Sequence, residues 1–112
     1  MIILLPPSET KRDGGDESAV LDWSQLSFPE LTPSRKVVTS AVTELASDTE
    51  AAQKALGISA KQLFEVERNR TLATAPVMPA LERYTGVLFD GLDAASMTPT
   101  ERHFAHSTVV VH

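Results

Sequence analysis

The sequence contains no cysteine among its 112 residues. This absence excludes disulfide bonds, thiolate zinc sites and a cysteine nucleophile. A long apolar run is also lacking, because the apolar start at residues 2–5 ends at a pair of prolines. It has no basic segment before it and no small-residue cleavage site after it, so we expect neither a signal peptide nor a membrane-spanning helix. We therefore expect a cytoplasmic protein without a membrane partner.

An excess of positive charge is missing too. The chain has 10 lysines and arginines against 15 aspartates and glutamates, a net charge of -5. Contacts to nucleic-acid phosphates need cations, so the chain as a whole does not resemble a nucleic-acid binder. Residues 51–75, however, carry a net charge of +2 and leave -7 for the remainder. This mild basic segment is interpreted either as ordinary helix-surface charge, which charge alone favours, or as a binding patch.

Composition and pattern indicate one globular domain of mixed α/β class with a small sheet, since 42% of residues are apolar and 22% charged. Residues 2–5 and the β-branched residues 108–111 are interpreted as buried strands, and residues 80–84 as a further strand. Residues 12–30 are predicted to form an exposed loop. Its anchors to the body of the protein would be Trp23, Leu26 and Phe28.

Helix signals lie between these strands. Thr32 is predicted as an N-cap with Pro33 in the first helical position, and the helix would extend to about residue 46. Its apolar face would consist of Val37, Val38, Ala41, Val42 and Leu45. A short helix is expected at residues 87–92. Thr98, Pro99 and Glu101 combine an N-cap, an N1 proline and a capping box, which predicts a last helix.

Two further helices are expected to meet at Gly57. Ser47 and Glu50 form a candidate capping box for the first, and Gly57 would end it in the left-handed conformation. Ser59 and Gln62 would begin the second, with Leu63 and Phe64 on its buried face. The pattern resembles a helix-hairpin-helix element, in which backbone N–H groups at a helix N-terminus bind phosphate. An ordinary helical corner is the alternative, because Ser59 stands where the usual form has a second glycine.

Three segments in order, MIILLPPSETK, ALGIS and PALERYTGVLFDGLDAASM, resemble the N-terminal half of the YaaA family of bacterial peroxide stress proteins. Members are longer than this chain. We therefore expect residues 1–112 to form a single N-terminal portion of a YaaA-like domain, with the helix-hairpin-helix-like element at about residues 48–70. This domain would be incomplete by itself, and a missing C-terminal half or a second chain would complete the fold.

The resemblance implies an intracellular protein that protects cells from hydrogen peroxide by limiting iron-dependent damage, with a positively charged cleft and DNA as its partner. The loop beside the cleft would contain Ser8, Thr10 and Lys11, although Glu9 replaces a lysine that some members carry. We expect no cofactor, no metal and no catalytic residue. The DNA-binding residues implied by the hairpin match are Lys54, Gly57, Ser59, Ala60, Lys61, Arg68 and Arg70.

Other interpretations remain open. The chain could be an enzyme that uses residues 8–11 and Asp90 on a small phosphorylated ligand, although the sequence favours a protein that is not an enzyme. It could also be an incomplete domain without independent function. His103 and His106 could bind a metal with His112 or Glu101, the ordinary alternative being a polar helix face.

Overall fold

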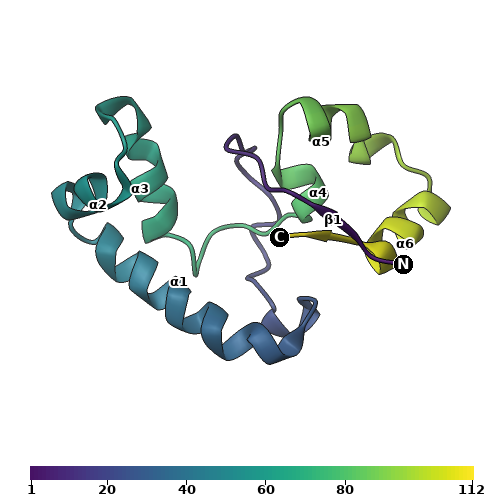
Figure 1. The fold of residues 1–112 in the computed structure, drawn as a ribbon, viewed down its shortest axis with the longest axis horizontal. Helices are drawn as coiled ribbons and strands as arrows, with labels where there is room; N and C mark the ends of the chain where they lie inside the picture. Colours follow the sequence, from purple (N-terminus) through teal and green to yellow (C-terminus); the bar gives the residue numbers. More distant parts are fainter. The chain divides into compact units, whose positions relative to one another are not determined.

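The computed structural model describes all 112 residues, and the chain forms two compact units. The first unit contains residues 1–16 and 77–112, and the second contains residues 17–76. Figure 1 shows the helices and strands of both units. The mixed α/β class predicted from the sequence is confirmed, with six α-helices and one two-stranded sheet. None of the helices is both long and apolar enough to cross a membrane.

The sheet of the first unit pairs the two ends of the chain. Strands β1 (Ile3–Leu5) and β2 (Val109–Val111) run parallel, with Ile3 opposite Val109 and Leu5 opposite Val111 (Figure 1). Both predicted terminal strands are therefore confirmed, although Thr108 belongs to the preceding helix. The expected burial of the first strand is wrong, because Leu4 is 63% exposed. Parallel strands are buried only where other elements cover both faces of their sheet.

The helices of the first unit are α4 (Ala80–Arg83), α5 (Val87–Leu92), η4 (Ala94–Ser96) and α6 (Pro99–Thr108). The strand predicted at residues 80–84 is wrong, because residues 80–83 form α4. Their side chains are good helix formers, and the Pro79 carbonyl accepts the N–H groups of Glu82 and Arg83, each at 2.9 Å. The capping box of α6 is confirmed, since the Thr98 N–H donates to Glu101 Oε2 at 2.8 Å.

The second unit contains η1 (Trp23–Gln25), η2 (Pro29–Leu31), α1 (Thr32–Ala46), α2 (Thr49–Leu56), η3 (Ala60–Gln62) and α3 (Leu63–Arg70). Helix α1 ends as predicted, but Thr32 is its first residue rather than its cap, because η2 runs directly into it. The cap of α2 is Asp48 rather than Ser47. Asp48 accepts the Ala51 N–H at 3.0 Å, whereas the Ser47 hydroxyl donates back to the Glu44 carbonyl at 2.7 Å.

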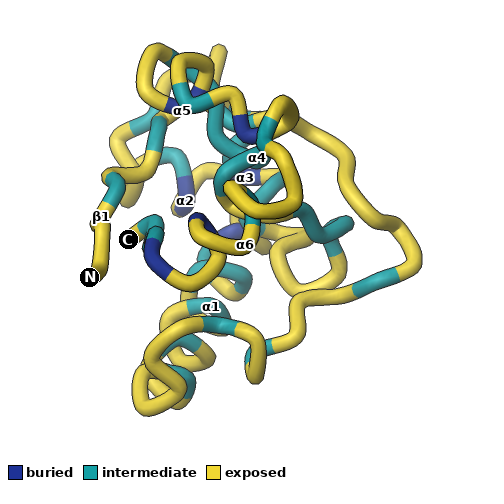
Figure 2. Tube along the Cα trace, turned by 90° about the vertical axis from the view of Figure 1, so that its right-hand side faces the viewer, coloured by how far each residue is buried: buried dark blue, intermediate teal, exposed yellow.

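The core of the second unit is small. Its buried residues are Ala46, Ala52 and Val66, against which Leu45, Ile58 and Leu63 pack. In Figure 2 the buried positions appear as short dark blue segments in a largely exposed chain. The predicted burial of Phe64 is wrong, since this residue is 52% exposed. Helices α2 and α3 contact α1, and burial is complete only at its C-terminal residue, so Val37 and Val38 on the predicted apolar face stay 69% and 61% exposed.

The segment before α1 is mostly irregular, as predicted, and includes the short turns η1 and η2. Trp23 and Leu26 are half-buried. Phe28 is not an anchor, because it is 39% exposed and has left-handed backbone angles at φ 59°.

Candidate functional site

The corner between α2 and α3 contains five of the seven predicted DNA-binding residues. We use the name "α2–α3 corner" for residues 54–62. Gly57 ends α2 with φ 65° and ψ 27°, the left-handed conformation expected for it, and its N–H donates to the Gln53 carbonyl. The Ser59 N–H donates to Gln62 Oε1 at 3.0 Å, and this confirmed capping box begins the next helix. The left-handed glycine and the capping box together therefore determine where this helix begins.

This corner exposes groups that attract anions. The N–H groups of Ala60 and Lys61 lie in the first helical turn, where a helix offers them no carbonyl acceptor. The side chains of Lys54 and Lys61 belong to exposed residues on the two sides of Gly57. Backbone N–H groups and ammonium groups both favour a negatively charged ligand at this position.

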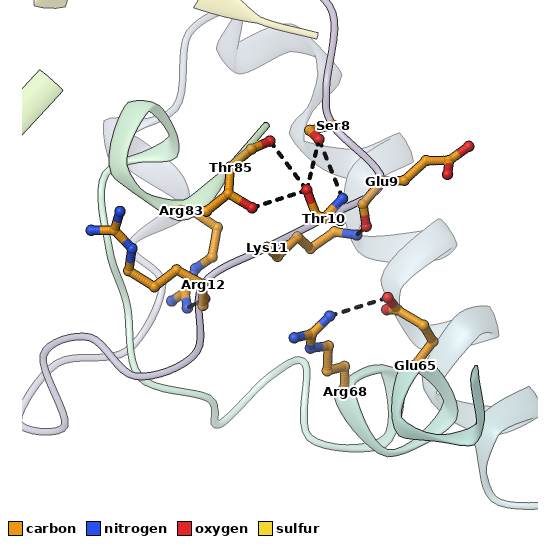
Figure 3. A network of polar contacts seen from close by, with 9 residues as sticks. All are labelled: Ser8, Glu9, Thr10, Lys11, Arg12, Glu65, Arg68, Arg83 and Thr85. Carbon is orange, nitrogen blue, oxygen red and sulfur yellow. Dashed lines mark hydrogen bonds and ion pairs between the residues drawn. The ribbon is translucent and has the colours of Figure 1, made fainter. Parts of the chain in front are cut away.

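Arg68 and Arg70 lie toward the other end of α3, where they make contacts within the unit. Arg68 Nη1 lies 3.1 Å from Glu65 Oε1 (Figure 3), and its guanidinium lies 5.0 Å from the centroid of the Phe64 ring. Lys61 and Arg70 are separated by about 13 Å along the helix axis, from the ordinary helical rise. The structure therefore does not gather the seven predicted residues into one cluster.

Arg70 makes contacts that hold helices together. Its Nε and Nη2 atoms donate to the Ala46 carbonyl at 3.2 and 3.0 Å, and Nη2 also donates to Thr49 Oγ1 at 3.2 Å. Its Nη1 atom forms an ion pair with Glu67 Oε2 at 2.5 Å. Ala46 is the last residue of α1 and Thr49 the first of α2, so the guanidinium joins three helices.

A second polar cluster lies in the first unit, where the loop after β1 meets the segment before α5 (Figure 3). The Thr85 hydroxyl donates to Thr10 Oγ1 at 2.9 Å, and the Thr10 hydroxyl donates to the Thr85 carbonyl at 3.2 Å. The Thr10 N–H donates to Ser8 Oγ, also at 3.2 Å. Ser8 Oγ also lies 3.2 Å from Thr10 Oγ1, so hydrogen bonds connect the three hydroxyl groups to one another (Figure 3).

Positive charge and a glycine accompany these hydroxyls. The Arg12 N–H donates to the Arg83 carbonyl, and Arg83 Nη1 donates to the Arg12 carbonyl, each at 2.7 Å. Lys11 Nζ donates to the Glu9 carbonyl at 3.2 Å. Gly86 has φ 103°, and a Cβ atom there would lie 3.3 Å from Ser8 Oγ, so this approach favours glycine. We call Ser8, Thr10–Arg12, Arg83, Thr85 and Gly86 the hydroxyl–arginine cluster.

The sequence predicted part of this cluster. Ser8, Thr10 and Lys11 are the residues that the family resemblance implies for the loop beside the cleft, and their role stays a prediction. Arg12 and Arg83 were missed, because their contact joins residues far apart in the chain and no local pattern signals it.

The weaker candidates do not assemble. Asp90 lines a cavity of about 230 Å³ together with Arg12 and Asp93, and none of Ser8, Thr10 and Lys11 lines it. No group of three histidine, aspartate or glutamate side chains lies close enough to hold a metal ion.

Comparison with known proteins decides the family. The family model described as peroxide stress protein YaaA matches residues 1–112. The chain belongs to the YaaA family. The resemblance seen in the three sequence segments is therefore confirmed.

The curated relatives of this YaaA-family chain are longer than it is. A UPF0246 protein from Corynebacterium glutamicum is 50% identical over 97 residues, which cover 87% of this chain and 38% of that protein. One from Corynebacterium efficiens is 50% identical over 99 residues, covering 88% of this chain and 39% of the relative. One from Streptomyces coelicolor is 43% identical over 112 residues, covering 99% and 43%. The chain thus spans about two fifths of their length, and no solved structure matches it.

Proposed function

We propose that this YaaA-family chain contributes a DNA-backbone contact to a peroxide stress protein that limits iron-dependent damage, and that the α2–α3 corner makes this contact. In this proposal residues 1–112 are the N-terminal portion of the family domain, with a helix-hairpin-helix-like element at about residues 48–70. The exposed N–H groups of Ala60 and Lys61, with an ammonium group on each side of Gly57, carry the proposal.

The chemistry of the corner fits a phosphate better than a base edge. Backbone N–H groups and lysine ammonium groups bind phosphate oxygens without reading sequence. Gly57 turns the chain in the left-handed conformation and places no side chain where a phosphate would approach. A Cβ atom added at Gly57 would have no neighbour within 4 Å, so the space beside it is open. We therefore expect binding that depends on salt and only weakly on base sequence.

The contacts that Arg68 and Arg70 make within the protein reduce the number of residues expected to bind phosphate. Arg68 forms an ion pair with Glu65, and Arg70 makes hydrogen bonds or ion pairs with Ala46, Thr49 and Glu67. We propose that Arg70 acts mainly in folding and that the phosphate contacts come from Lys54, Lys61 and the backbone between them.

A salt titration of DNA affinity tests the proposal. Lys54→Gln and Lys61→Gln should each reduce the slope of log affinity against log salt by about 1, because each removes about one phosphate contact. Lys36→Gln is the matched control, since Lys36 is an exposed lysine of the same unit outside the corner. Equal slopes in all three variants and the parent chain would remove DNA binding from the corner.

A small phosphorylated ligand at the hydroxyl–arginine cluster is the second candidate, with an enzymatic role as its further implication. The observation that favours it is the group of connected hydroxyls of Ser8, Thr10 and Thr85 in the same unit as the Arg12–Arg83 contact. Inorganic phosphate and a panel of nucleotides and sugar phosphates should raise the melting temperature of the chain, and Ser8→Ala should reduce this shift. Ser107→Ala, at an exposed position of α6, is the control. No shift with any compound would contradict this candidate.

A further inference from the structure

An apolar cavity of about 680 Å³ lies entirely within the second unit. Residues before α1, the first turns of α1 and the turn after α3 surround it. Its apolar walls are Val20, Leu21, Trp23, Leu31, Val38 and Leu72. The volume falls in the range of about 300 to 1,000 Å³ that small-molecule sites occupy. The α2–α3 corner contributes none of its residues, so this cavity is separate from the proposed phosphate contact.

The charge of the cavity has one sign. Arg35 is the single ionisable residue in its lining, with Ser34 and Thr39 adding hydroxyl groups. The Lys36 ammonium lies 5.9 Å from the centroid of the Trp23 ring. No aspartate or glutamate lines the cavity. An anionic group would therefore find a cation beside an apolar surface, and a cationic group would find no carboxylate to pair with.

The Arg35 guanidinium is held in place at this cavity. Its Nη1 atom donates to the Phe28 carbonyl at 3.0 Å. Phe28 has a left-handed backbone, which side chains disfavour, and the hydrogen bond from Arg35 supports that turn. A guanidinium carries five N–H donors in a planar fork, so this one contact leaves donors for a carboxylate. A cation fixed in advance loses less side-chain entropy on binding.

We propose that this cavity binds a small amphipathic carboxylate of the fatty-acid class. The hydrocarbon chain lies against Trp23, Val38 and Leu72, and the carboxylate pairs with Arg35. This site is independent of the DNA contact proposed above. Apolar walls give affinity through removal of hydrocarbon from water, and the single cation selects the charge of the head group.

Fluorescence of Trp23, the only tryptophan of the chain, gives a direct readout. Decanoate, titrated below the concentration at which it forms micelles, should change this fluorescence saturably. Decyltrimethylammonium has the same hydrocarbon chain with the opposite charge and should bind at least about tenfold more weakly. In the unmodified protein, octanoate should bind more weakly than decanoate by about fourfold for each methylene removed. Fatty-acid binding thus has a test that needs no variant.

Two neighbouring valines supply a matched pair of variants. Val38 lines the cavity and Val37 does not, although both are exposed residues of α1. Val38→Gln should weaken decanoate binding about fivefold, whereas Val37→Gln should leave it unchanged. Arg35→Gln should weaken decanoate binding about tenfold and abolish the preference over the cation, because it removes the single ionisable residue in the cavity lining.

The same experiment can overturn the proposal. Equal binding of decanoate and decyltrimethylammonium would show an apolar surface without charge selection, such as one that another polypeptide covers. Absence of a saturable change, or equal loss in the Val37 and Val38 variants, would likewise exclude a carboxylate site here. Circular dichroism of each variant establishes that its helices are intact, and the chain-length comparison holds even where a variant unfolds.

Discussion

Replacing Arg70 with methionine should lower the stability of the second unit of this chain. Methionine keeps an unbranched side chain of similar length but has no donor for the Ala46 carbonyl or the Thr49 hydroxyl. Ala46 is 1% exposed, and its carbonyl lies in the last turn of α1, where positive charge is favourable. The variant therefore removes both a charge at a helix terminus and the hydrogen bonds that join three helices.

The expected loss of stability follows from these contacts. A hydrogen bond to a charged group contributes about 1.5 to 3 kcal/mol when buried. The Arg70 side chain is 42% exposed, so solvent screens part of this interaction, and we expect Arg70→Met to lower the free energy of unfolding by about 1 to 2 kcal/mol. Glu67 is 60% exposed, and Glu67→Gln should cost no more than about 0.5 kcal/mol.

Urea unfolding followed by Trp23 fluorescence measures this difference, because Trp23 belongs to the same unit as Arg70. The denaturant midpoint should fall while the slope of free energy against urea stays constant. Lys54→Met removes one positive charge from an exposed residue of the same unit and should leave the midpoint nearly unchanged. Arg70→Met with parental stability, or equal losses in the two variants, would refute a structural role for Arg70.

Three further predictions concern residues in helices and at their ends. Gly57→Ala should destabilise the second unit by about 1 kcal/mol in urea unfolding, because the position has φ 65° and the cost is conformational, with open space around it. Gly91 lies inside α5, also in open space, so Gly91→Ala should instead stabilise that helix and slow its amide exchange. If both substitutions stabilised their helices, or both destabilised them, this reasoning would be wrong. The hydrogen bonds from the Thr98 hydroxyl and N–H lower the pKa of the Glu101 carboxyl. The capping box is therefore fully formed above the ordinary glutamate range and is lost as pH falls through the lowered pKa. NMR titration should show that Thr98→Ala raises the pKa of Glu101 toward its usual value; an unchanged pKa would assign the shift to another cause.

Local signals in the sequence were reliable for the helix ends. Gly57, the Ser59–Gln62 box and the Thr98–Glu101 box occur where they were predicted. Each depends on groups within four residues of one another, so the sequence contains the whole interaction. The proline pair that ends the first apolar run likewise follows directly after the last residue of β1.

Competition between neighbouring groups limited other local predictions. Ser47 and Asp48 are both good caps, and Asp48 bonds to the α2 backbone while Ser47 bonds back to α1. Residues 80–83 had a short apolar pattern compatible with a strand, and local hydrogen bonds to the Pro79 carbonyl made them helical. Short segments of this kind carry too few side chains to distinguish the two periods.

The sequence by itself determined the family, the mixed α/β class, where most helices begin and end, and which face of α1 is apolar. Only the tertiary structure decided whether that face is covered, and Val37 and Val38 remain exposed. Periodicity could not predict this exposure, because it identifies an apolar face of a helix but not the element that packs against it. It also decided the pairing of β1 with β2, the contact of Arg70 with Ala46, and the meeting of Ser8 and Thr10 with Thr85. These interactions join residues distant in the chain, and their geometry depends on how the elements between them pack.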